Sequence, residues 1–441
     1  MKWVFGTLVL LTFGLVFKLG LLVYAMYTLL GVLFVSRYLA WTWTGHLSAS
    51  RQCDQDAVQI GESATMTVTV LNSGRLRVPW LLLDDSLPLE ALRQHPPRLQ
   101  LNGKTLLLTQ MPVGSEKSFT YEVRFLMRGY YQFGPLLLES GDLFGLHRRY
   151  RVVTAPHCVL VYPKVVPLEG YDIASRRPIG EVRISHRLFE DPTRIAGVRP
   201  YQLGDPFNRI HWHATARTGQ LHSKVYDPSC IAGATILLDF HASTLKLKNP
   251  HYRTELAATT AASLANAVYQ MGEQIGLITN GRDAAERTRF EGWHEEFRTR
   301  TTARAKANTL DRSERLQPLL VETRRGVAQL ERILETLARL ELTDGFTFPQ
   351  LVTETASRLP RDATVIAILT EVTEEAALAL GNLRRSGYAV IAVLVLFGET
   401  EYYDWAQPPD WAHRLVAEAI DFRRVDDEAS LSRLCAERIL R

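Results

Sequence analysis

Residues 234–239 read Ala-Thr-Ile-Leu-Leu-Asp, a short apolar run that ends in a carboxylate. Such a run is typical of a parallel strand buried on both faces, because that kind of strand needs no alternating polar residues. Three later runs have the same character: 274–281, 364–370 and 387–396. Helical patterns lie between them: 254–271, 327–340, 347–359 and 374–386. The alternation predicts an α/β domain over residues 231–441, with a parallel sheet that helices cover on both faces.

Polar residues follow the strands of this domain. In open α/β sheets, ligands bind beyond the carboxyl ends of the strands, which is where Asp239, Thr370 and Glu371 fall. The layout is similar to the von Willebrand factor A (vWA) fold, a Rossmann-like fold. Its adhesion site holds a divalent ion with an Asp-x-Ser-x-Ser motif, a loop Thr and a further Asp. Asp239 and Ser243 match the motif, whereas His241 stands where the first Ser is expected.

This resemblance implies a degenerate Mg²⁺ site at Asp239, Ser243 and Glu371, since Mg²⁺ prefers hard oxygen ligands. Thr323 is a poor match for the loop Thr, and the imidazole of His241 is bulkier and softer than a hydroxyl. In the alternative interpretation, Asp239 caps the following helix or accepts hydrogen bonds from loop amides, and the strand ends bind protein without a metal. In both interpretations, we expect the sheet edge that carries Asp239 to serve for docking.

A charged stretch at residues 282–326 interrupts the α/β pattern. It is rich in arginine and also contains Phe290, Trp293 and Phe297. Two interpretations remain open: a solvated loop, or an insertion over the sheet edge that contacts a partner.

Residues 46–165 follow a different period. Residues 64–70 alternate apolar and polar side chains, as a half-buried strand does, and the turn signal at 72–74 follows them. Further candidate strands are 80–83, 104–109, 118–125, 136–140 and 159–162. Short strands at this spacing predict an antiparallel β-sandwich of the immunoglobulin-like kind. We find no catalytic constellation in this stretch, which favours a spacer or binding module.

The N-terminal stretch, residues 3–35, is almost wholly apolar, with Lys18 as its one charged residue. It is longer than the apolar core of a signal peptide, and no Ala-x-Ala cleavage site follows it. Two interpretations are open. Two short membrane spans turn near residue 18, or one span covers roughly residues 19–40 with Trp41 and Trp43 at the interface.

The hairpin is favoured because it places Lys2, Arg37 and Arg51 on one side of the bilayer, and positive charge favours the cytoplasmic side. We therefore predict a transmembrane helical hairpin over residues 1–45, in the inner (cytoplasmic) membrane of a cell. The lipid bilayer is then a partner, and the soluble domains lie in the cytoplasm.

The segment 166–230 connects the sandwich to the α/β domain and concentrates Arg, Asp, His and Trp. Asp205 with Arg209 and Arg217 can form an internal ion-pair network. A basic pocket for an anionic partner and a metal pair at His211 and His213 are alternatives. A hydrolase built on Asp205 and the two histidines has only this clustering in its favour, since we find no GxSxG, HExxH or P-loop motif.

The order of residues in this segment resembles a bacterial family known as domain of unknown function fifty-eight. The matching run is Tyr201-x-x-Gly204-Asp205-x-x-x-Arg209-Ile210-x-Trp212-x-x-x-Ala216-Arg217. The resemblance implies a membrane-anchored protein with a vWA-like domain, often encoded beside MoxR-type AAA+ ATPases. It also implies a role in chaperone-like assembly or metal insertion.

These patterns together favour a non-enzymatic adaptor over an enzyme. The predicted binding residues are those of the signature motif: Tyr201, Gly204, Asp205, Arg209, Trp212 and Arg217. The expected partner is an AAA+ ATPase or another membrane protein, and a structural role in cell-envelope assembly is the alternative.

A net charge of +4 without a Lys/Arg tract argues against nucleic acid as a partner. Four widely spaced cysteines without a CxxC motif fit a reducing compartment.

Overall fold

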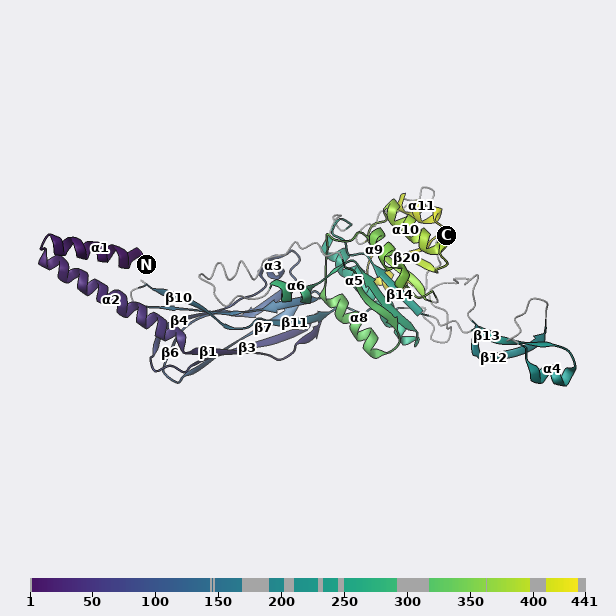
Figure 1. Cartoon of the computed structure of the whole chain (residues 1–441), viewed down its shortest axis with the longest axis horizontal. Helices are drawn as coiled ribbons and strands as arrows, with labels where there is room; N and C mark the ends of the chain where they lie inside the picture. Colours follow the sequence, from purple (N-terminus) through teal and green to yellow (C-terminus); the bar gives the residue numbers. More distant parts are fainter. Residues whose placement is uncertain are drawn as a thin grey trace. The chain divides into compact units, whose positions relative to one another are not determined.

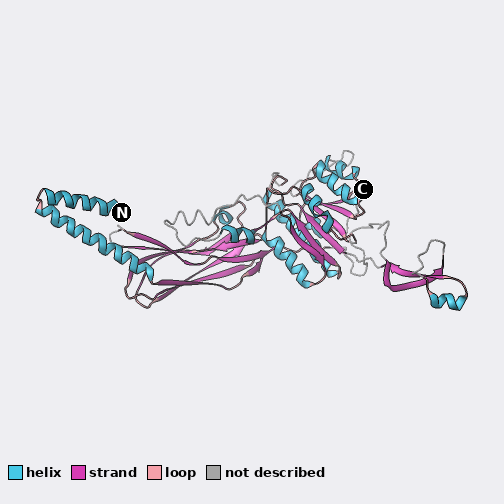
Figure 2. Ribbon diagram, in the orientation of Figure 1, coloured by secondary structure: helices cyan, strands magenta, loops and turns pink. Residues whose placement is uncertain are grey.

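The computed structural model describes residues 2–142, 145, 147–168, 190–201, 210–228, 233–244, 250–291, 317–361, 363–396 and 410–434. The chain divides into two compact units (Figure 1, Figure 2). The first comprises Met1–Lys164 with Asp283–Ser313 and Ala338–Leu340; the second comprises Val165–Arg282 with Glu314–Leu337 and Glu341–Arg441. The N-terminal helices and the sandwich therefore belong to one unit, and the sheet of the α/β domain to the other.

Two N-terminal helices form the predicted hairpin: α1 (Lys2–Val16) and α2 (Gly20–Gly45) (Figure 1). Lys18 in the turn adopts a φ of 50°, in the left-handed region. A β-carbon on Gly14 would lie 3.2 Å from Val23 of the facing helix, so the glycine lets the two helices approach closely.

Among the described helices, α2 is the one long and apolar enough to cross a membrane, whereas α1 is apolar but shorter. At 1.5 Å per residue, α2 is roughly 39 Å long, against about 30 Å of bilayer hydrocarbon.

The C-terminal end of α2 is built into the sandwich. Trp43 belongs to the buried core of the sandwich. Arg151 donates to three carbonyls at the junction of α2 and the first strand, at 3.0–3.2 Å. These carbonyls include helix-end acceptors that have no partner within the helix. Farther along α2, the hydroxyl of Ser36 lies 3.0 Å from Nδ1 of His147. The helix therefore enters the sandwich through several fixed contacts.

Short strands build the predicted sandwich. They are β1 (Leu47–Cys53), β2 (Ala57–Gln59), β3 (Ser63–Asn72), β4 (Val78–Asp85), β5 (Leu99–Gly103), β6 (Leu106–Met111), β7 (Glu116–Phe125), β8 (Gly129–Phe133), β9 (Leu136–Gly141), β10 (Arg148–Thr154) and β11 (His157–Tyr162), with the helix α3 (Leu89–Arg93) after β4. They form sheets in the orders β1-β3-β7-β5, β10-β9-β4-β6 and β2-β11-β8. Pairing is antiparallel except between β2 and β11. The alternation predicted at 64–70 is confirmed, since Ala64, Met66, Val68 and Val70 are all buried.

A charged pair lies inside the sandwich. Arg51, which we expected near the membrane surface as a topology signal, pairs with Asp85, and the two side chains are 3% and 0% exposed. The hydroxyl of Tyr121 donates to the same carboxylate at 2.6 Å. Burial, followed by the charge of Asp85, raises the pKa of Tyr121 far above its ordinary value. The buried carboxylate thus accepts hydrogen bonds from two side chains, Arg51 and Tyr121, as a charge removed from water requires.

The α/β domain contains a six-stranded sheet in the order β17-β15-β14-β19-β20-β21. Its strands are β14 (Gly233–Leu238), β15 (Gln274–Thr279), β17 (Leu319–Arg324), β19 (Thr364–Leu369), β20 (Val390–Val395) and β21 (Asp421–Val425). All neighbours are parallel except β15 and β17. The predicted vWA-like sheet is confirmed, with an antiparallel edge strand added. Because β17 belongs to the sheet, the stretch outside the α/β pattern ends before residue 319 and does not reach 326.

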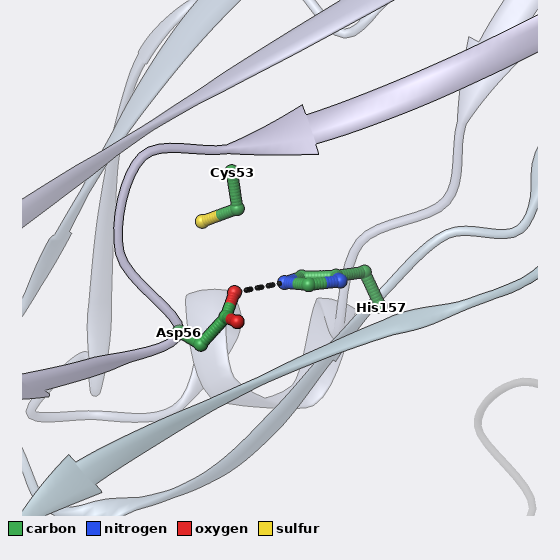
Figure 3. A group of neighbouring side chains, drawn as sticks. All are labelled: Cys53, Asp56 and His157. Carbon is green, nitrogen blue, oxygen red and sulfur yellow. Dashed lines mark hydrogen bonds and ion pairs between the residues drawn. The ribbon is translucent and has the colours of Figure 1, made fainter.

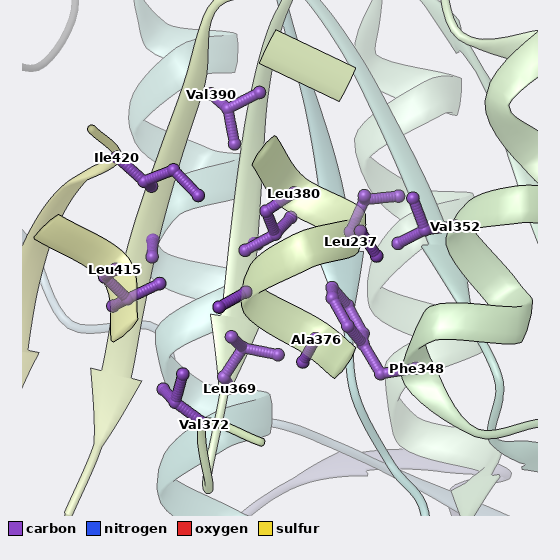
Figure 4. Packing of buried hydrophobic residues seen from close by; sticks show 14 of the residues in the cluster. Leu237, Phe348, Val352, Leu369, Val372, Ala376, Leu380, Val390, Leu415 and Ile420 are labelled. Carbon is purple, nitrogen blue, oxygen red and sulfur yellow. The ribbon is translucent and has the colours of Figure 1, made fainter. Parts of the chain in front are cut away.

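Helices cover both faces of this sheet. They are α5 (Pro250–Gln270), α8 (Val327–Arg339), α9 (Phe348–Thr355) with the 3₁₀ turn η2 (Ala356–Arg358), α10 (Glu374–Arg385), α11 (Asp410–Ala417) and α12 (Glu428–Ser432). On one face, Leu237, Leu369 and Val390 pack with Phe348 of α9 and Leu380 of α10 (Figure 4). The helix α5 packs against β14, β15, β19 and β20. Most of its buried side chains are small (alanine, serine or threonine), which allows close approach to the sheet.

The connecting segment contains the hairpin β12 (Glu190–Pro200) and β13 (His222–Pro228), with α4 (Trp212–Thr218) between the two strands. The remaining short elements are β16 (Arg282–Asp283), α6 (Ala284–Glu291) and β18 (Leu340–Glu341).

Candidate functional site

The carboxyl end of β14 leads directly into Asp239. The backbone amide of Asp239 donates to the carbonyl of Ile368 in β19 at 3.0 Å, which fixes its position at the end of the sheet. The residue is 1% exposed. Our expectation that Asp239 lies on the solvent-facing edge of the sheet is therefore wrong, because neighbouring loops close over the carboxylate.

Asn280, the residue that follows β15, holds this carboxylate. Its Nδ2 donates to Oδ1 of Asp239 at 2.8 Å and to the carbonyl of Phe346 at 2.9 Å. Its Oδ1 accepts from the amide of Phe240 at 2.7 Å. The amide of His241 also donates to Asp239, at 3.2 Å. Burial raises the pKa of Asp239, and the hydrogen bonds from Asn280 and His241 oppose that rise without cancelling it.

A buried threonine from a later loop completes this region. Thr343 precedes α9, and its carbonyl accepts from the amide of Ala242 at 2.7 Å. From the sequence, Thr323 was compared with the loop Thr of the vWA adhesion site. In the structure it lies in β17, and its hydroxyl shares a hydrogen bond with Thr235 at 2.8 Å. The signal that was missed is the turn sequence Thr343-Asp344-Gly345 before a helix. It places the backbone of Thr343 next to the loop that follows β14, while the Thr343 hydroxyl accepts from the amide of Gly345 at 3.0 Å.

The three predicted Mg²⁺ ligands do not present a suitable set of oxygens. The hydroxyl of Ser243 lies 2.6 Å from Nδ1 of His241, so the imidazole engages it. Glu371 is exposed, whereas Asp239 is enclosed. Mg²⁺ requires near-octahedral oxygen geometry and retains several waters, which an enclosed carboxylate beside an imidazole does not offer. The residues present therefore do not fit Mg²⁺. None of the contacts described for Asp239, Ser243 and Glu371 supports magnesium binding.

The described part of the signature motif is exposed on α4, whereas Ile210 just before this helix is buried. Trp212, the first residue of α4, is 68% exposed. Arg217 is exposed in the last turn of the same helix, and Tyr201 is half-buried at the end of β12. The predicted residues Gly204, Asp205 and Arg209 lie outside the described residues. Trp212 and Arg217 are thus the described motif residues that a partner can reach.

Hydrogen bonds hold α4 against the hairpin. Nδ1 of His211 accepts from the amide of Ala214 at 3.0 Å and caps the helix. The carbonyl of His222 accepts from the amide of His211 at 2.8 Å, and the amide of His222 donates to the hydroxyl of Thr215 at 3.1 Å. The ring centroids of His211 and His213 are 6.4 Å apart. His211 therefore acts as a helix cap, and its engaged Nδ1 counts against the alternative of a metal pair at His211 and His213.

These elements define the class of protein: a vWA-like α/β domain that follows a β-sandwich and an apolar helical hairpin. Residues 197–294 match the family described as "Protein of unknown function DUF58". Over 237 residues the chain is 25% identical to the uncharacterized protein YeaD of Bacillus subtilis (strain 168), covering 53% of this chain. The match spans only 56% of that relative's length. The family model thus matches the stretch that contains the signature motif, as the resemblance implied.

Similar solved structures are distant. A von Willebrand factor type A protein from Catenulispora acidiphila is 15% identical, with a TM-score of 0.27, and the match covers 48% of this chain and 42% of that one. A CARDB domain from Pyrococcus furiosus, solved in complex with di-metal ions, is 18% identical, with a TM-score of 0.17, and the match covers 26% of this chain and 91% of that one. The fold class rests on the strand order of this chain's own sheets.

Proposed function

We propose that this protein is a membrane-anchored, non-enzymatic adaptor that docks an AAA+ ATPase of the MoxR type during the assembly or maturation of other proteins. The observation that carries the proposal is Trp212, an indole 68% exposed within the family's own signature. The ATPase as partner comes from the family resemblance. The geometry supports a protein-binding surface on α4.

The chemistry of α4 suits protein recognition. Tryptophan and arginine are enriched among the residues that dominate binding energy at protein interfaces. Trp212 and Arg217 lie on a helix in which every residue is at least partly exposed. The hydrogen bonds to His211 and His222 hold this helix in place. Little conformational entropy is therefore lost when a partner binds it.

The anchor supports the membrane part of the proposal. Leu21 and Tyr24 of α2 are 91% and 75% exposed, as expected for side chains that face lipid. Lys2 and Arg37 favour a cytoplasmic location for the soluble units, by the positive-inside rule. Single cysteines in surface loops, labelled from each side of the membrane, would test this sidedness. Labelling of the sandwich from the periplasmic side would contradict it.

The partner is tested by affinity purification of the full chain from detergent-solubilised membranes, with and without ATP. We expect an AAA+ ATPase to co-purify, and Trp212→Ala to reduce its recovery by about tenfold or more. Leu378→Ala, an exposed apolar residue on α10, is the matched control and should leave recovery unchanged. Absence of any ATPase under both conditions would count against the proposal. Recovery of another membrane protein in its place would favour the cell-envelope alternative.

A further inference from the structure

Three side chains of different chemistry meet at one end of the sandwich: Cys53, Asp56 and His157 (Figure 3). Their candidate ligand atoms all lie within 4.8 Å of one another. We propose that they form a Zn²⁺ site with one coordination position open to solvent. The site lies in the sandwich, contains no residue of the signature helix, and does not depend on the proposed adaptor function.

The sheet hydrogen bonds fix the backbone of all three residues. Cys53 is the last residue of β1 and pairs with Met66 of β3. His157 is the first residue of β11 and pairs with β8. The carbonyl of Asp56, just before β2, accepts from the amide of Leu160 at 2.9 Å. Sites supported by strands are held more accurately than sites on free loops.

The short loop between Cys53 and Asp56 is pinned as well. The carboxylate of Asp54 accepts from the amide of Thr65 at 2.8 Å, and the amide of Asp54 donates to the carbonyl of Thr65 at 3.3 Å. The loop therefore needs no ordering when a cation arrives, and little conformational entropy opposes binding.

The ligand chemistry favours zinc. Thiolate sulfur, imidazole nitrogen and carboxylate oxygen all bind Zn²⁺, at about 2.3, 2.0 and 2.0–2.2 Å. These bond lengths place two ligand atoms on a tetrahedral ion roughly 3.3–3.6 Å apart. Nε2 of His157 is now 2.9 Å from Oδ1 of Asp56, as in a hydrogen bond that the ion would replace. The Asp56 side chain is 77% exposed and free to rotate by the small amount required. Water would occupy the fourth position.

A nucleophilic role suits this cysteine less well. Burial raises the pKa of the Cys53 thiol, and the nearby charges of Asp54 and Asp56 raise it further. A reactive cysteine needs the opposite shift. A dication between the thiol and the carboxylate reverses this balance, because a coordinating thiol loses its proton. On binding, the Cys53 proton passes to solvent, and His157 would ligate through the lone pair of Nε2.

The test is a Co²⁺ titration of the detergent-solubilised full chain, with Zn²⁺ competition. Cobalt reports a thiolate ligand through a sulfur-to-metal charge-transfer band. We expect one equivalent of Co²⁺ to produce this band and Zn²⁺ to abolish it. Cys53→Ser should remove the band. Cys158→Ser is the matched control, since this half-buried thiol is adjacent to His157 but outside the group.

Asp56→Asn provides a variant that we expect to fold like the wild type, because the side chain is 77% exposed. We expect it to weaken Co²⁺ binding by at least about tenfold. A band that persists in Cys53→Ser would assign the metal to another thiol and overturn the proposal. Absence of Co²⁺ and Zn²⁺ binding at micromolar free metal would also overturn it, and would leave His157 and Asp56 as a surface ion pair.

Discussion

Asn280 donates a hydrogen bond of 2.8 Å to the carboxylate of Asp239, although 41 residues separate them in the sequence. The pair joins the carboxyl ends of β14 and β15 below the protein surface. Asn280 also bonds to Phe240 and Phe346, so a single side chain holds two loops together. Buried polar networks are most stabilising when every member is satisfied. In this one, Oδ1 of Asp239 is satisfied, whereas Oδ2 forms no hydrogen bond with the described residues.

Asn280→Ala should therefore destabilise the α/β domain. The substitution leaves the amide of Phe240 without its acceptor and the carbonyl of Phe346 without its donor, and each such group costs about 1–3 kcal/mol. The carboxylate of Asp239 loses one donor and keeps the amide of His241. We expect a loss of about 3 kcal/mol in the free energy of unfolding, measured by urea denaturation. Asn382→Ala, at an exposed position of α10, should change it by less than about 0.5 kcal/mol. Equal effects of the two substitutions would contradict this role.

Asp239→Asn should show a pH-dependent gain in stability. Because the folded-state pKa of Asp239 lies above the ordinary value of 3.8, its contribution to stability is complete below 3.8 and is lost as pH rises through the folded-state pKa. Asparagine avoids this loss and keeps an oxygen that accepts from Asn280. We expect a higher melting temperature than wild type at neutral pH, with a difference that disappears in acid. A variant less stable than wild type at neutral pH would indicate that a cation or donor holds the carboxylate.

Magnesium should leave the melting temperature of the wild-type chain unchanged. A cation that binds the folded state raises stability by RT ln(1 + [L]/Kd), so a real site would be detected at millimolar Mg²⁺. The enclosure of Asp239 and the contact between His241 and Ser243 lead us to expect no shift. A rise in the wild type that Asp239→Asn abolishes would place a cation at this site after all.

Asp85→Asn should destabilise the sandwich strongly. The substitution leaves the buried guanidinium of Arg51 without its counter-charge, which typically costs about 3–5 kcal/mol. Glu322→Gln breaks an ion pair with Arg324 whose side chains are 62% and 65% exposed, and it should cost less than about 1 kcal/mol. Denaturant unfolding of both variants measures the contrast. Similar losses in the two would argue against a buried pair.

The α/β core was predictable because its strands are continuous apolar runs. Residues 234–238 are apolar or small throughout, and all of them are buried in β14. The edge strand β17 was not predicted, since its sequence ends in Glu-Thr-Arg and its outer positions stay partly exposed. An edge strand buries less surface, and its pattern is therefore weaker. Strand β10 was missed for the same reason, because it contains three arginines.

The sequence by itself determined the apolar core strands and the helices between them, that Asp239 ends a strand, and that Trp212 belongs to a polar motif. Periodicity expresses these features locally, within one or two turns of chain. Only the tertiary structure decided that Asp239 is buried by loops from β15 and α9, that Trp212 is exposed, and that Cys53 meets His157. Those outcomes depend on which distant strands pair, as β2 does with β11, and on what closes over each strand end. A local pattern of residue types does not encode either property.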